Sequence, residues 1–122
     1  MLSSTADLEV RPLTRLFRAL GDETRLRIVA LLSHGELCVC HLEKALGLNQ
    51  PNASRQLGIL KSSGVVDSRR NGTWVYYFLT TQEHEAVAKA LAVLVKTFGA
   101  EKALARDHAK LLKSCGPNAC SS

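Results

Sequence analysis

Two cysteines separated by one residue, Cys38 and Cys40, are the clearest candidates for chemistry in this sequence. The surrounding pattern predicts a helix that begins at Glu36 or Leu37 and ends at Leu46, so both cysteines are expected in its first turn. Unpaired N–H groups at a helix N-terminus favour the thiolate, which is the form that binds metals. Thiolates prefer soft or borderline ions such as trivalent arsenic and antimony, Cd, Pb, Zn and monovalent Cu. The pair is therefore a candidate metal site, and the alternative is two buried small apolar residues.

The spacing of this pair also predicts how an ion would act on the protein. Residues two apart on an intact helix point about 200° away from each other, so one ion is expected to take both sulfurs only if the first turn distorts. We therefore expect ion binding to deform this helix and, through it, the helix that follows.

Two further cysteines, Cys115 and Cys120, lie in residues 113–122, which we expect to form a flexible tail. Either is a candidate third ligand, and the alternative is a pair of exposed thiols that oxidise. His41 lies beside the first pair, but a single histidine near a helix start is expected to be a surface or capping residue. Four cysteines without an export signal favour thiols or metal ligands over disulfides.

Composition limits the class of protein. The chain has 122 residues, of which 46% are apolar and 22% charged, so we expect one folded domain over residues 1–112. No apolar run approaches the ~20 residues that cross a bilayer, and the N-terminus lacks the parts of a signal peptide, so we expect a cytoplasmic protein with no membrane contact. We expect no enzyme and no permanent cofactor, because the sequence has no Gly-rich phosphate loop, nucleophile elbow or pair of catalytic acids.

Apolar spacing and capping residues predict four short helices before residue 65. Asn49 can cap the fourth helix, Pro51 is tolerated in its first turn, and Ala53, Leu57 and Leu60 form its inward face. The four helices are expected from near Pro12 to Leu20, from Glu23 to Leu32 after the capping Asp22, over the cysteine-bearing segment, and from about Asn49 to just before Gly64.

A β-hairpin is expected after the fourth helix. From Val65 the apolar period changes from 3.6 to 2, and Asn71-Gly72 between two β-rich runs predicts a type I′ turn. Two helices joined by a tight turn and followed by a hairpin make a winged helix-turn-helix, which is a mainly α fold with a small β-hairpin. After Thr81 one long helix is expected to continue past Gly99, and it is expected to form a homodimer contact together with the first helix.

The net charge of +5 is concentrated where this fold would meet DNA. Residues 49–80 carry an excess of three positive charges, and the fourth helix is expected to lie in the major groove of a pseudo-palindromic double-stranded operator. The side chains expected to contact bases or phosphates are Gln50, Asn52, Ser54, Arg55 and Gln56 on the helix and Arg69, Arg70 and Asn71 on the hairpin.

Four segments carry a resemblance to the ArsR/SmtB family of small winged-helix metalloregulators. Residues 20–32 (LGDETRLRIVALL), 50–60 (QPNASRQLGIL) and 71–79 (NGTWVYYFL) resemble its entry segment, recognition helix and wing. Residues 36–42 (ELCVCHL) are similar to the ELCVCDL box of its arsenite and antimonite repressors and of its cadmium and lead branch. The resemblance implies a homodimeric repressor that leaves its operator on binding trivalent arsenic or antimony. The alternatives are a response to Cd, Pb or Zn, or to oxidation of the same cysteines.

The sequence departs from the family pattern at three positions. Glu43 stands where the box of arsenite repressors has a third cysteine, which removes a ligand. His41 replaces an acid of the box, and Gln56 replaces the histidine of the usual S-R-H in the recognition helix. The paired acid and histidine ligands of the family's zinc sensors, and the N-terminal cysteines of its cadmium and lead branch, are both absent. These two absences favour arsenite or antimonite.

Overall fold

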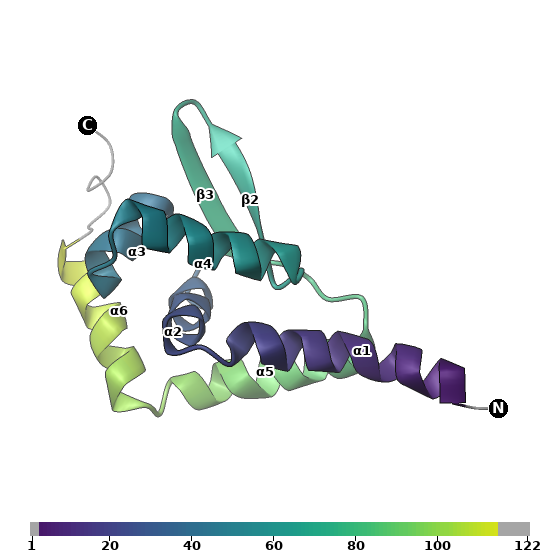
Figure 1. The fold of residues 1–122 in the computed structure, drawn as a ribbon. Helices are drawn as coiled ribbons and strands as arrows, with labels where there is room; N and C mark the ends of the chain where they lie inside the picture. The colour runs from purple at the N-terminus through teal and green to yellow at the C-terminus, as the bar shows by residue number, and fades with distance from the viewer. Residues whose placement is uncertain (1–2, 115–122) are drawn as a thin grey trace.

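The computed structural model describes residues 3–114, and it describes side chains for residues 10–113. These residues form six helices and a small three-stranded sheet (Figure 1). In chain order the elements are α1 (Ser3–Leu20), α2 (Glu23–Leu32), β1 (Leu37–Cys38), α3 (Val39–Leu46), α4 (Gln50–Ser62), β2 (Val66–Asn71), β3 (Trp74–Leu79), α5 (Glu85–Phe98) and α6 (Lys102–Ser114).

Helix α2 is at the centre of the core. Five consecutive residues at its C-terminal end, 28–32, are buried, because α1, α3, α4, α6 and β3 pack around it. Asp22 caps its N-terminus by accepting a hydrogen bond from the Arg25 N–H at 3.1 Å, as its position before the helix predicted. Burial of apolar side chains on all sides of one short helix holds the surrounding helices to a single core.

The helix-turn-helix formed by α3 and α4 is confirmed. Asn49 caps α4 by accepting from the Asn52 N–H at 2.9 Å, and Ala53, Leu57 and Leu60 are all buried. Gly47, which ends α3, has a φ of +65°, a conformation that favours glycine. The two capping residues fix where α3 stops and α4 starts, so the turn between them is short.

The predicted hairpin is present, but its turn and its sheet differ from the prediction. Asn71 pairs with Trp74, so the two central turn residues are Gly72 and Thr73, and Gly72 has a φ of +67°. Since no described residue other than glycine has a positive φ, the expected type I′ turn over Asn71-Gly72 is wrong. A third strand, β1, adds to the free edge of β3, giving the antiparallel order β1-β3-β2.

Three helix boundaries also differ from the sequence predictions. Helix α1 begins at Ser3 rather than near Pro12, and the proline lies inside it. Helix α3 begins at Val39, because the two preceding residues are extended and pair with β3. The single long helix expected after Thr81 is two helices, since the chain turns at residues 99–101.

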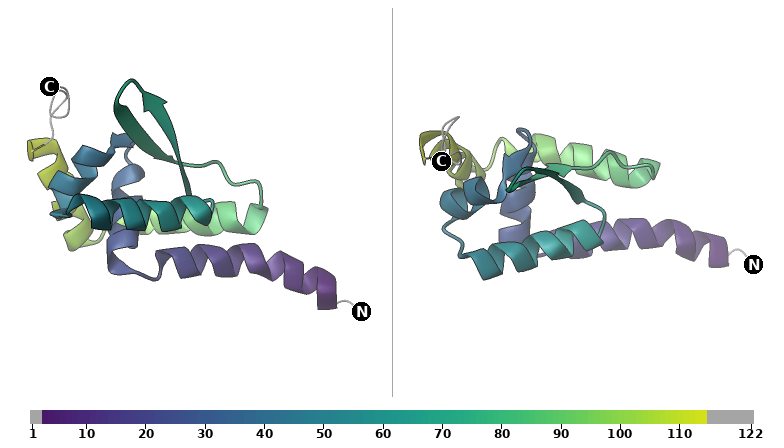
Figure 2. Two further views of the ribbon diagram at one scale, coloured as in Figure 1. Left: turned by 45° about the horizontal axis from the view of Figure 1, so that its top comes forward. Right: turned by 90° about the horizontal axis from the view of Figure 1, so that it is seen from above.

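The turn after α5 changes the direction of the chain. Figures 1 and 2 show that α5 runs alongside α1, whereas α6 turns back toward α3. Helix α6 packs on α3 and α2, and Leu111 and the carboxylate-bearing Asp107 are buried there. Every helix within residues 3–114 is too short or too polar to span a bilayer. Residue 112, the expected end of the domain, lies inside α6. Residues 113 and 114, expected in the flexible tail, are the last two residues of this helix, and residues 115–122 lie outside the described residues.

Candidate functional site

The structure brings the sulfurs of Cys38 and Cys40 to 3.0 Å from each other. Cys38 is the N-cap residue of α3 and is extended, with φ −73° and ψ 150°, while Cys40 lies in the first turn of the helix. The two side chains therefore do not follow helical spacing. The expectation that an ion must distort the helix to reach both sulfurs is wrong, because β1 already holds Cys38 out of the helix.

A pocket of about 280 Å³ opens beside this pair, between α3, the start of α4 and the hairpin. Cys38 is only 2% exposed, and Cys40 is half-buried. Within the described part of the chain, no three side chains of His, Cys, Asp and Glu gather as a metal-binding cluster. The other candidate ligands, Cys115 and Cys120, lie outside the described residues. The pocket is lined by Cys38, Val39, Cys40, Glu43, Gln50, Thr73, Trp74 and Val75.

His41 has the capping role that the sequence analysis preferred. Its Nδ1 accepts a hydrogen bond from the Cys38 N–H at 3.3 Å, which satisfies a backbone donor at the start of α3. Burial, followed by the nearby charge of Lys44, lowers the pKa of His41 below its ordinary value. A neutral imidazole is the form that can accept this hydrogen bond, so the electrostatics and the geometry agree.

The segment that leads to the sulfur pair, residues 36–38, is joined directly to the β2–β3 hairpin, the wing of this fold. In the sheet, Leu37 pairs with Tyr77 and Cys38 pairs with Tyr76 of β3. Glu36, just before β1, accepts two hydrogen bonds from Arg69 of β2, both at 2.6 Å. These bonds lower the pKa of Glu36.

The same arginine guanidinium lies 4.8 Å from the centre of the Tyr76 ring. Arg69 therefore links Glu36, just before β1, to the hairpin, and its expected contact with DNA stays a prediction.

The polar side chains of α4 form an ordered network. The Asn52 side-chain oxygen accepts from Arg55 at 3.1 Å and from Gln56 at 3.2 Å. Gln56 in turn accepts from Arg25 of α2 at 3.0 Å. Gln56 is therefore held by the protein itself, and Arg25 is a supporting residue that the sequence analysis missed. Three of the predicted contact residues on α4 are exposed, namely Gln50, Ser54 and Arg55.

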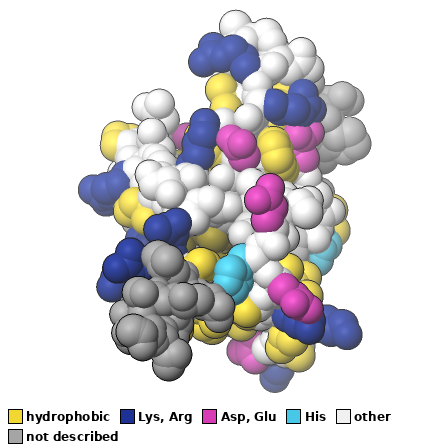
Figure 3. Space-filling view, turned by 90° about the vertical axis from the view of Figure 1, so that its right-hand side faces the viewer, with side chains coloured by type: hydrophobic (Ala, Val, Ile, Leu, Met, Phe, Trp, Pro, Cys, Tyr) yellow, Lys and Arg dark blue, Asp and Glu magenta, His cyan; other side chains and the backbone are white. Residues whose placement is uncertain are grey.

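Basic side chains mark the face that carries the hairpin. Arg70 and Asn71 are exposed near its tip, as expected for residues that contact DNA. Figure 3 shows Lys and Arg side chains at the top of the molecule, where the hairpin lies, and along one side of this face. Since Arg69 is paired with Glu36, the exposed Arg70 is the residue of the hairpin placed to attract a polyanion.

Helix α6 is tied to the core by polar groups that the sequence analysis did not find. Arg27 of α2 donates two hydrogen bonds to Asp107 at 2.7 and 2.8 Å, and the carboxylate is buried. The His34 and His108 rings stack with their centres 3.6 Å apart. One signal was available: Asp107 lies between Leu104 and Leu111 at helical spacing, so a charge occupies an inward position.

Comparison with known proteins gives the family. Residues 22–68 match the family described as "Bacterial regulatory protein, arsR family". The chain is 54% identical over 67 residues to the arsenical resistance operon repressor of Escherichia coli K12; the match covers 54% of this chain and 57% of that protein. It is 43% identical over 100 residues to the arsenic resistance transcriptional regulator ArsR2 of Pseudomonas putida KT2440, covering 81% of this chain and 84% of that one.

The fold matches solved structures as well. One is the homodimeric winged helix-turn-helix DNA-binding domain Mb0332 from Mycobacterium bovis, with a TM-score of 0.65, 36% identity, and coverage of 83% of this chain and 89% of that domain. The chain spans little more than half the length of the E. coli repressor that it matches. The long match to the P. putida regulator and the shared fold agree with the resemblance seen in the sequence. The chain belongs to the arsR family of bacterial regulatory proteins.

Proposed function

We propose that this chain is a homodimeric transcriptional repressor that leaves its operator when Cys38 and Cys40 bind trivalent arsenic or antimony. The observation that carries the proposal is the 3.0 Å sulfur pair, placed where the wing and the recognition helix meet. The names of the E. coli and P. putida relatives, which describe arsenic resistance, support the choice of ion.

The sulfur pair suits a thiophilic ion. Two thiolates that share one ion at about 2.3 Å each lie roughly 3.3 to 3.8 Å apart, depending on the bond angle. The observed separation needs only a small rotation of the two side chains to reach this range. In the reduced protein, Cys38 and Cys40 would hold the ion, and Cys115 or Cys120 remains the candidate third ligand.

The ion would act on DNA binding through two short connections. On one side, Cys38 pairs in the sheet with Tyr76, a strand residue of the wing. On the other side, α3 packs against α4, and Gln50 at the start of α4 lines the cysteine pocket. An ion that rearranges the sulfurs would shift elements whose positions DNA binding requires, so the ion and DNA would oppose each other by linkage.

The DNA contacts are assigned to the exposed polar residues of α4 and the wing. Gln50, Ser54 and Arg55 are exposed and can reach base edges and phosphates, and Arg70 and Asn71 are placed to follow the backbone beside them. The remaining two candidates on α4, Asn52 and Gln56, mainly order the helix surface. Two copies related by a two-fold axis would read a pseudo-palindromic operator.

The dimer contact is assigned to α1 and α5, which pack side by side (Figure 2). Each carries a large apolar side chain that this chain does not cover: Phe17 is 55% exposed and Val93 is 64% exposed. Val10 on α1 is also 55% exposed. Apolar side chains gathered on adjacent helices of a small protein are typical of a contact with a second copy.

The test is fluorescence anisotropy of the reduced protein on DNA from upstream of its own gene, with arsenite, antimonite, cadmium, zinc and peroxide added separately. We expect arsenite or antimonite to release the DNA at low stoichiometry. Release by cadmium or zinc alone would identify another metal, and release by peroxide alone would identify an oxidant sensor that uses the same cysteines. DNA binding that no addition changes would refute the regulatory role of Cys38 and Cys40.

Variants locate the ligands. Cys38→Ala and Cys40→Ser are expected to bind DNA like the unmodified protein but to need at least about tenfold more arsenite for release, because each removes one of the two paired sulfurs. Cys115→Ser and Cys120→Ser identify the third ligand, since only the variant that removes it weakens the response. Thermal unfolding is measured for each variant, because Cys38 is buried.

A further inference from the structure

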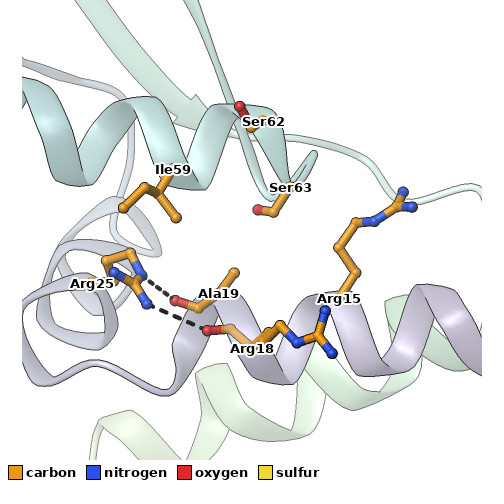
Figure 4. Close-up of a pocket in the computed structure, with 7 residues that line it drawn as sticks. All are labelled: Arg15, Arg18, Ala19, Arg25, Ile59, Ser62 and Ser63. Atoms are coloured by element: carbon orange, nitrogen blue, oxygen red, sulfur yellow. Dashed lines mark hydrogen bonds between the residues drawn. The ribbon is translucent and has the colours of Figure 1, made fainter.

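A second positively charged site lies at the other end of the recognition helix. A cleft of about 340 Å³ separates α1 and the start of α2 from the C-terminal end of α4 (Figure 4). Three arginines line it, and its described lining has no acidic residue. The lining residues are Arg15, Arg18, Ala19, Arg25, Ile59, Ser62 and Ser63.

Two of the three arginines have unengaged guanidinium groups in the described part of the chain. Arg15 and Arg18 are exposed on α1, and within residues 10–113 neither guanidinium forms a hydrogen bond or ion pair. Figure 4 shows the Arg15 side chain extending from α1 toward the level of the end of α4, with the Arg18 guanidinium on the same side. Their positive charges are therefore available to a ligand.

The third arginine is fixed and connects this cleft to the recognition surface. Arg25 donates through Nε to the Ala19 carbonyl at 2.6 Å, and through Nη1 to Gln56 of α4 at 3.0 Å. A bridge from α1 to α4 holds the walls of the cleft in place. It also fixes the position of the cleft relative to Asn52 and Arg55, which belong to the same hydrogen-bonded network.

We propose that this cleft binds a backbone phosphate of the same DNA whose major groove α4 reads. Arg55 and Ser62 are seven residues apart, which is about 10 Å along a helix. The major groove is about 12 Å wide, so a helix that contacts bases near Arg55 meets the phosphates at the groove edge near Ser62. Arginine is the residue best suited to bind a phosphate, because its guanidinium can donate two parallel hydrogen bonds. The inference rests on the proposed DNA-binding function.

The first test measures how DNA affinity depends on salt. We expect Arg15→Gln/Arg18→Gln to lower affinity on the order of tenfold at about 0.15 M salt and to reduce the slope of log K against log salt by about 2, one lost phosphate contact per protomer of a dimer. The matched control is Lys102→Gln/Lys113→Gln, which removes the same charge from exposed positions on α6. An equal effect in both variants would show only a net-charge effect and would overturn the assignment.

The second test identifies the phosphate and does not depend on how α1 contributes to a dimer. Single methylphosphonates, which lack the phosphate charge, are placed along the operator. At one position in each half-site the substitution is expected to weaken binding by the unmodified protein and to have no further effect on the Arg15→Gln/Arg18→Gln variant. If every methylphosphonate lowers the DNA affinity of the double variant by as much as that of the unmodified protein, the assignment of a phosphate to the cleft is refuted.

A third measurement distinguishes a DNA phosphate from a small free anion as the ligand of the cleft. Titration calorimetry of the protein without DNA is expected to show no binding of inorganic phosphate below about 1 mM, since one phosphate offers too few contacts for tight binding. Tighter phosphate binding that the double variant loses would make the cleft a small-anion site instead.

The outcomes also distinguish failure of this inference from failure of the proposed function. If the unmodified protein binds no DNA at all, the proposed function itself fails. If it binds DNA and releases it with arsenite, but the double variant is unchanged, only the cleft assignment fails.

Discussion

The ion pair between Arg27 and Asp107 should be the most sensitive polar contact in the described part of the protein. It joins α2, at the centre of the core, to α6, which packs on the cysteine-bearing α3. The Asp107 side chain is 6% exposed, whereas that of Arg27 is 33% exposed. Substituting Asn for Asp107 keeps the shape but removes the charge, leaving Arg27 beside a neutral amide.

The expected loss of stability in Asp107→Asn follows from the exposed fractions of the two side chains. Breaking a fully buried pair costs about 3 to 5 kcal/mol, and an exposed pair contributes less than about 1 kcal/mol. Because Arg27 keeps part of its hydration, we expect Asp107→Asn to lower the free energy of unfolding by about 2 to 3 kcal/mol. For a domain of this size the melting temperature should fall by roughly 8 to 12 °C.

The assay is thermal and urea unfolding followed by circular dichroism at neutral pH and one protein concentration, since a dimer's stability depends on concentration. The control is Glu85→Gln, which removes an exposed pair with Lys89, 80% and 75% exposed, and should change stability by less than about 0.5 kcal/mol. Arg27→Met/Asp107→Leu should recover most of the loss, because apolar residues of similar size can replace a buried pair. If Asp107→Asn is as stable as the control, the assignment of a buried, structurally important pair is refuted.

Three further predictions concern other parts of the fold. Asn49→Ala should cost about 1 kcal/mol in urea unfolding and weaken DNA binding, because the N-cap of α4 is lost; equal stability would contradict the cap. Gly47→Ala should cost about 1 kcal/mol, and Gly47→Asn less, because φ is +65°; equal losses would point to another cause. Burial, and then the charge of His108, lower the pKa of His34. The unfolded chain therefore takes up its proton first, so stability should fall as pH drops below about 6.5. His34→Gln should flatten this pH dependence, and an unchanged slope would exclude His34 as its source.

Local signals in the sequence predicted the helix-turn-helix correctly. Asn49, Pro51 and the apolar spacing of Ala53, Leu57 and Leu60 are all short-range features, and capping and amphipathic burial depend on few distant contacts. The two-helix unit and the hairpin therefore follow from the sequence alone. The residue types of the cysteine pair likewise favour soft ions, and ion binding there stays a prediction.

The sequence could not show how the two sulfurs are oriented. Their spacing suggested opposite sides of one helix turn, but β3 pairs with residues 37 and 38 and keeps Cys38 extended. That pairing joins segments far apart in the chain, and no local pattern encodes it. The sequence also could not show that Arg69 pairs with Glu36, because these residues are 33 positions apart; its expected contact with DNA stays a prediction.

The sequence by itself determined the helix-turn-helix, the presence of a hairpin and the basic character of residues 49–80, since these depend on residue type and short-range spacing. That Cys38 and Cys40 bind a soft ion stays a prediction from residue type. Only the tertiary structure decided that the sulfurs lie 3.0 Å apart, that Arg27 and Asp107 form a pair, and that Arg15 and Arg18 share a cleft with α4. The physical reason is that each of these contacts requires the chain to bring together groups whose relative positions are set by packing of the whole core.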